Sequence, residues 1–112
     1  MTSHVTTHVL DAVSGRPAEG IDVALWRVSE ESAERLAAAR TDTDGRVRDL
    51  GPEELAPGTY RVTFATGAYF AARGVETFYP SVTIDFFVEA GRDHYHVPCL
   101  LSPFAYSTYR GS

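Results

Sequence analysis

The sequence predicts an all-β fold, a two-sheet β-sandwich of seven to eight strands with one short helix. Three observations favour this class. Apolar and polar residues alternate with a period of two in several short segments, Gly and Pro turn signals separate these segments, and 112 residues suit one hydrophobic core. We expect a single domain over residues 1–112, because neither a repeat nor a linker interrupts the chain.

The first half of the chain contains two clear strand patterns. Residues 4–10 and residues 21–28 both alternate apolar with polar side chains. The segment between them carries two glycines and a proline, which favour turns. We therefore expect two strands joined by a turn-rich connection.

Residues 30–40 are ambiguous. They are rich in helix formers and follow Ser29, which could cap a helix. The next residues, 41–45, read Thr-Asp-Thr-Asp-Gly, a tight-turn signal that would join a strand ending near residue 41 to one beginning at Arg46. The pattern alone leaves helix and strand open.

The second half of the chain is predicted to hold four strands and the helix. The helix candidate, residues 66–74, is closed by Gly74. Pro98 lies inside a strand pattern and lacks an N–H, which implies an edge position or a local irregularity. The strand candidates are residues 59–65, 81–88, 93–101 and 104–109.

Composition narrows the function classes. Ten Lys and Arg against fifteen Asp and Glu give a formal charge of −5, which disfavours nucleic acid and anionic lipid as partners. The single cysteine, Cys99, excludes an intrachain disulfide, and no apolar run approaches the roughly 20 residues of a membrane span. With no leader visible at the N-terminus, we expect a soluble, cytoplasmic protein with no membrane partner.

The strand parity of residues 93–101 separates two kinds of side chain. His94 and His96 fall on the outward face, whereas Cys99 falls in the apolar layer, where a thiol stays protonated and inert. Outward histidines are most often simply solvated. Their spacing also suits two zinc ligands on one strand, although an H-x-H pair without a clear third ligand is a weak signal.

Three further residues have an ordinary and a functional interpretation. Arg46 directly follows a tight turn and reads as a surface arginine, while Tyr109 and Arg110 lie so near the end of the chain that they would normally fray. The residues alone thus predict an all-β domain with a candidate histidine-lined site.

Three stretches of the chain resemble the transthyretin-like family. They are Thr-His-Val-Leu-Asp at residues 7–11 followed by Gly-Arg-Pro-Ala at 15–18, Thr-Asp-Thr-Asp-Gly-Arg at 41–46, and the segment from His-Tyr-His-Val-Pro at 94–98 to the final Tyr-Arg-Gly-Ser. Within the family the ending resembles that of the 5-hydroxyisourate hydrolases, which the hormone-carrying transthyretins lack. The carriers also place Lys, Glu and Thr at the positions of His8, Arg46 and His96.

The resemblance implies a fold and an assembly. The family fold is a two-sheet sandwich with one short helix, in which residues 31–40 would be a strand. Members form homotetramers with active sites in a channel between dimers.

The resemblance also implies the hydrolysis of 5-hydroxyisourate, a purine-derived small molecule, without a metal or organic cofactor. His8, Arg46 and His96 would be catalytic. His8, Arg46, Tyr109, Arg110 and Ser112 would bind substrate, and Gly111 would allow a turn that folds the tail over the pocket. Two alternatives stay open, a metal-dependent cyclic amidase using His8, His94 and His96, and a binding module without catalysis.

Overall fold

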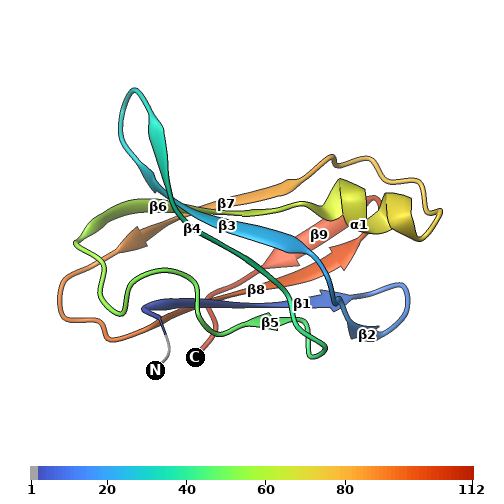
Figure 1. Cartoon of the computed structure of the whole chain (residues 1–112), viewed down its shortest axis with the longest axis horizontal. Helices are drawn as coiled ribbons and strands as arrows, with labels where there is room; N and C mark the ends of the chain where they lie inside the picture. Colours follow the sequence, from blue (N-terminus) through green and yellow to red (C-terminus); the bar gives the residue numbers. More distant parts are fainter. Residues whose placement is uncertain (1–2) are drawn as a thin grey trace.

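The computed structural model describes residues 3–112, and in it two β-sheets pack face to face (Figure 1). The five-stranded sheet contains β1 (Val5–Asp11), β2 (Arg16–Pro17), β5 (Arg46–Val47), β8 (Tyr95–Ser102) and β9 (Ala105–Thr108). The four-stranded sheet contains β3 (Asp22–Val28), β4 (Ala33–Arg40), β6 (Gly58–Phe64) and β7 (Val82–Val88). The predicted all-β sandwich is confirmed. The described residues form nine strands where seven to eight were expected, and two of these, β2 and β5, are only two residues long.

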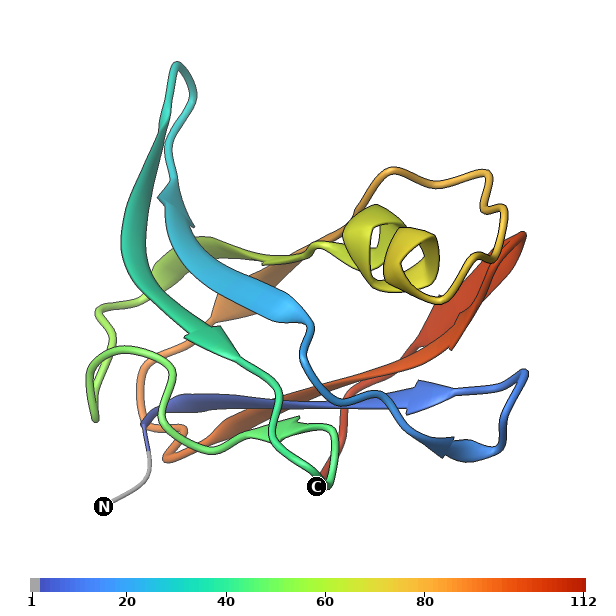
Figure 2. The same cartoon turned by 45° about the vertical axis from the view of Figure 1, so that its right-hand side comes forward.

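The helix α1 (Thr66–Ala72) follows β6 and lies at one end of the sandwich (Figures 1 and 2). Gly74 follows it with φ of 67°, a left-handed conformation that favours glycine after a helix end, as the sequence predicted. No helix in residues 3–112 has the length and apolar character needed to span a membrane.

The centre of the five-stranded sheet is a parallel pair, β1 and β8. On its other side β1 pairs with two short strands, with β5 near its middle and with β2 at its C-terminal end. The other side of β8 pairs with β9. This arrangement brings residues near both ends of the sequence onto one sheet surface.

Alternate residues of β1 and β8 face the core. Val5, Val9, Val97 and Cys99 are all buried, and the face that parity assigned to the core is the one that packs against the second sheet. Burial raises the pKa of the Cys99 thiol to about 11, so the prediction of an inert, protonated thiol agrees with the structure.

The ambiguous segment is a strand. β4 pairs with β3 from one end to the other with one register shift at Leu36, and Ala37 and Ala39 pack against the core. The Arg40 guanidinium also donates a hydrogen bond to Asp22 on the neighbouring strand, at 2.9 Å. Pairing and burial override the helix propensity of these residues, as the resemblance implied.

The edge position proposed for Pro98 is wrong, because β8 has a neighbour on each side. The alternative, a local irregularity, is what the structure shows. The ladder to β9 ends at Cys99 and Thr108, and the tail pairs again only at an isolated bridge between His96 and Gly111. Pro98 lies in this gap, where its missing N–H interrupts no ladder, and its carbonyl accepts the Thr108 hydroxyl at 2.7 Å.

Candidate active site

The site begins with a cross-strand pair. His8 on β1 lies directly opposite Arg46 on β5 in an antiparallel ladder, which places both side chains on the same face of the sheet. That face points away from the second sheet, because the residues before and after His8 on β1 point into the core. The predicted strand start at Arg46 is confirmed.

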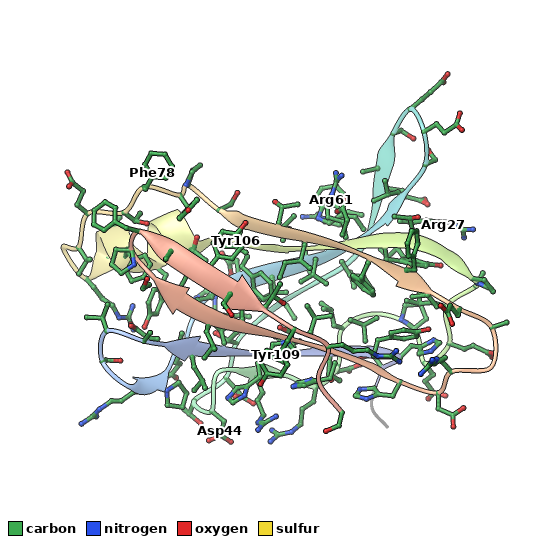
Figure 3. The ribbon with its side chains drawn as sticks, turned by 180° about the vertical axis from the view of Figure 1, so that it is seen from behind. Arg27, Asp44, Arg61, Phe78, Tyr106 and Tyr109 are labelled. Carbon is green, nitrogen blue, oxygen red and sulfur yellow. The ribbon has the colours of Figure 1, made fainter. Side chains whose placement is uncertain are left out.

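The turn before Arg46 is held at several points. The Asp42 carboxylate accepts backbone N–H groups from Asp44 at 2.9 Å and from Arg46 at 3.0 Å. Gly45 has φ of 74°, and a Cβ there would collide with the Val9 carbonyl oxygen, so only glycine lets the turn approach β1 this closely. Arg46 is therefore presented from a fixed backbone. Figure 3 shows Asp44 at the outer edge of the molecule on this turn.

The parallel pairing of β1 with β8 adds a second histidine. His96 lies beside Thr6, so His8 and His96 share the outward face on adjacent strands. Next to them is a cavity of about 270 Å³, open on one side. It is lined by Thr6, Thr7, Arg46, Val47, Arg48, His94, His96 and Ser112.

Arg46 places a positive charge close to two histidines whose pKa values are lowered. Burial, and then the nearby Arg46 guanidinium, lower the pKa of His8. The same two causes lower the pKa of His96, with smaller contributions from His94 and His8. Among the ion pairs of residues 3–112 none involves Arg46. Its charge is thus available to an anionic group in the cavity.

The tail returns to His96. The Gly111 N–H donates to the His96 carbonyl at 2.9 Å, and the tail ends beside the turn that carries Arg46 (Figure 2), where Ser112 joins the cavity. The expected turn at Gly111 is not seen, because Gly111 pairs with His96 in an isolated β-bridge and its φ is not positive. A Cβ at Gly111 would instead lie 2.5 Å from the His96 ring carbon Cδ2, so glycine permits close packing on the imidazole.

Tyr109 and Arg110 lie elsewhere in the single chain. They line a second cavity of about 300 Å³ with residues of β7 and β8, and the Arg110 guanidinium lies 5.1 Å from the centre of the Tyr95 ring. Tyr109 is exposed where β9 ends (Figure 3). His96 lines both cavities. The chain therefore brings Arg46, His96 and Ser112 to one cavity, with His8 beside Arg46, but not Tyr109 or Arg110.

The remaining histidines have other roles. His4 is buried, accepts the Leu55 N–H at Nδ1 and contacts the Arg92 carbonyl through Nε2, so it fastens two loops to the start of β1. His94 precedes β8 and is not part of it. In residues 3–112 no three side chains of His, Cys, Asp or Glu gather as a metal site, so the cluster that a metal-dependent amidase would need from His8, His94 and His96 is not formed.

The sequence patterns did not single out Thr6, which lines the cavity. Thr6 hydrogen-bonds both His94 and His96 through its hydroxyl. It shares the parity of His8, which is a signal in the sequence, but its proximity to residues 88 and 90 positions away depends on the β1–β8 pairing.

Comparison with known proteins settles the family. Residues 5–111 match the model described as the HIUase/Transthyretin family. The chain belongs to this family. A 5-hydroxyisourate hydrolase of Caulobacter vibrioides is 48% identical over 114 residues, covering 98% of this chain and 99% of the relative.

Solved structures of the HIUase/Transthyretin family agree. The Klebsiella pneumoniae 5-hydroxyisourate hydrolase superposes with a TM-score of 0.86 at 43% identity, covering 98% of this chain and 99% of that one. Transthyretin from Sparus aurata superposes with a TM-score of 0.90 at 31% identity, covering 96% of each chain. Both functional branches of the family thus share this fold, and only the site residues can separate them.

Proposed function

We propose that this chain hydrolyses 5-hydroxyisourate to 2-oxo-4-hydroxy-4-carboxy-5-ureidoimidazoline, a step in urate breakdown. The observation that carries the proposal is the Arg46 guanidinium, free of carboxylate partners among residues 3–112, facing two histidines whose pKa values it lowers. The 43–48% identity to hydrolases over nearly the whole chain favours the same activity.

The proposed chemistry is attack of water on a ring amide carbonyl. The C–O bond forms, the C–N bond breaks, and the water proton ends on the departing nitrogen. Such a reaction needs a proton acceptor, a proton donor and stabilisation of the oxyanion. His8 and His96, kept neutral by burial and Arg46, would handle the protons, and Arg46 would stabilise the oxyanion.

The same proposal includes the substrate site and the assembly. We assign His8, Arg46 and Ser112 to substrate binding, together with Tyr109 and Arg110 from the second cavity that His96 also lines, in a homotetramer whose sites lie between dimers. Exposure of the His8 and His96 face in the single chain supports this, because another subunit would enclose a cavity that is now open. No cofactor is needed, since the substrate carbonyls are already electron-poor.

The test is direct. 5-Hydroxyisourate is generated from urate by urate oxidase, and its loss is followed with and without the protein. The proposal expects a large acceleration over the spontaneous decay. Decay at the spontaneous rate, together with tight binding of an iodinated aromatic hormone, would favour the binding module instead.

A further inference from the structure

One buried hydroxyl joins two imidazoles at the edge of the site. Thr6 Oγ1 lies 2.9 Å from His94 Nε2 and 2.8 Å from His96 Nδ1. Thr6 is only 7% exposed, and the two rings are nearly parallel, with an interplanar angle of 20°. Neither Thr6 nor His94 has a part in the reaction proposed above.

Counting hydrogens restricts what these three groups can do. A hydroxyl has one hydrogen to donate, and a neutral imidazole has one N–H and one acceptor nitrogen. When both rings are neutral, Thr6 donates to one ring and accepts from the other. In one arrangement His96 Nδ1–H donates to Thr6 and Thr6 donates to His94 Nε2. In the second arrangement both bonds run the opposite way.

The two arrangements give His96 opposite chemistry. In the first, its hydrogen is on Nδ1 and Nε2 carries a free lone pair, as a base requires. In the second, Nε2 carries the hydrogen, as an acid requires. His94 must change together with His96, since both rings hold their hydrogen on Nδ1 in the first arrangement and on Nε2 in the second.

We propose that Thr6 and His94 are positioning residues that couple the tautomer of His96 to that of His94 and relay a proton between them. The proposal rests on the proposed function, in which His96 exchanges protons with water and substrate. When His96 Nε2 takes the water proton, its Nδ1 hydrogen passes to Thr6 oxygen and the Thr6 hydrogen passes to His94 Nε2. When these two transfers reverse, His96 Nε2 donates its proton to the departing nitrogen. Thr6, His94 and His96 then hold their original hydrogens again.

The surroundings explain why the charge would move to His94. His96 faces the Arg46 guanidinium as well as His8 and His94, and its ring is partly buried. His94 is exposed, so water can solvate an imidazolium there. Between the two proton transfers the positive charge therefore rests on the ring that water reaches.

Nitrogen NMR of ¹⁵N-histidine-labelled protein tests the coupling without substrate. We expect His94 and His96 to show the same tautomer and to change together. In Thr6→Val each ring should follow its own preference. His4 is an internal reference, because the Leu55 N–H fixes its hydrogen on Nε2. The control Thr63→Val removes a strand hydroxyl that accepts the Trp26 indole N–H and should change neither ring.

Kinetics test the relay in the reaction. Thr6→Val should lower kcat roughly 10- to 100-fold with little change in KM, and Thr6→Ser should restore most of it. His94→Phe keeps an aromatic ring at an exposed position, so it folds even if Thr6→Val does not, and it should cost about as much. The double variant should cost no more than either single variant.

The outcomes separate the two proposals. Wild-type protein that does not turn over 5-hydroxyisourate overturns the proposed function. Different tautomers for His94 and His96 in wild-type protein, or full kcat in both Thr6→Val and His94→Phe, overturn the relay.

Discussion

Close packing against the His96 ring requires glycine at residue 111. A methyl group at this position would overlap Cδ2 of the imidazole. The Gly111 N–H also donates a hydrogen bond to the His96 carbonyl, which holds the two residues close together. Either the ring or the tail must move in Gly111→Ala. A misplacement of about 1 Å at a reacting group can cost 10²-fold, so we expect kcat/KM to fall by that order.

The control for this change is Gly15→Ala. Gly15 has φ of 74° in a turn with open space around it, so alanine strains the backbone without touching the site. Melting curves of the two variants are compared with their turnover. Full activity in Gly111→Ala would show that the tail does not fix His96.

The lowered pKa values of His8 and His96 predict the pH dependence of both activity and stability. The acid limb of kcat/KM should have its midpoint below 6.5, the ordinary histidine value. Because the unfolded chain binds these protons first as pH falls, the free energy of unfolding should decline through pH 6.5 and level off below the folded pKa values. Urea titrations from about pH 8 to 5 measure this slope.

The His8→Asn, His96→Asn double variant should lose most of the slope, because its side chains do not titrate. An equal slope in the variant and the wild type would assign the pH dependence to other groups. His4 and His94 are present in both proteins and so do not distinguish them.

Residue-level expectations succeeded where parity alone decides the outcome. Cys99 is in the core and His96 faces outward, because alternation along one strand is visible in one segment of sequence. The reason for Gly111 and the part played by Thr6 were not visible. Both depend on which atoms approach across strands far apart in the sequence.

At the scale of elements, the C-terminal tail lies against the candidate site. Beyond β9 it keeps pairing with β8 through the His96–Gly111 bridge, and Ser112 lies at the Arg46 cavity. Deleting residues 109–112, or adding a bulky C-terminal tag, should remove most activity. The core lies elsewhere, so the melting temperature should change little.

The same tag inserted between Glu30 and Glu31 is the control for the tail. This exposed turn joins β3 to β4 and projects away from the five-stranded sheet (Figure 1). Activity should survive there. Equal activity with the tag at the C-terminus would mean that the tail is not required.

Element types were harder to predict where local preference and pairing disagree. The segment Ala33–Arg40 has helix formers throughout, yet it forms a strand because β3 supplies partners at both of its ends and through all but one of its residues. Pro98 suggested an edge, but a central strand accepts it because the facing tail leaves a gap in the ladder. Both outcomes depend on neighbours that the local sequence does not contain.

At the scale of the whole molecule, the proposed tetramer would bury the sheet face that carries the site. Leu100 lies on this face and is 40% exposed in the single chain. Leu100→Asp should therefore keep the fold, as judged by circular dichroism, while reducing the assembly and the turnover. Light scattering should give about four times the chain mass of 12.3 kDa for the wild type and less for the variant. A wild-type mass of one chain would contradict the proposed assembly.

The central claim is that Arg46 and the histidines beside it form the reactive face, and Arg46→Gln tests it most directly. Arg61→Gln is the matched control, because Arg61 pairs with Asp85 on the other sheet (Figure 3), where an exposed ion pair contributes little stability. The measurement is kcat/KM for 5-hydroxyisourate in wild type and both folded variants. We predict a loss of roughly 10²- to 10³-fold for Arg46→Gln, as for an oxyanion-stabilising group, and none for Arg61→Gln. Near wild-type turnover in folded Arg46→Gln would contradict the account.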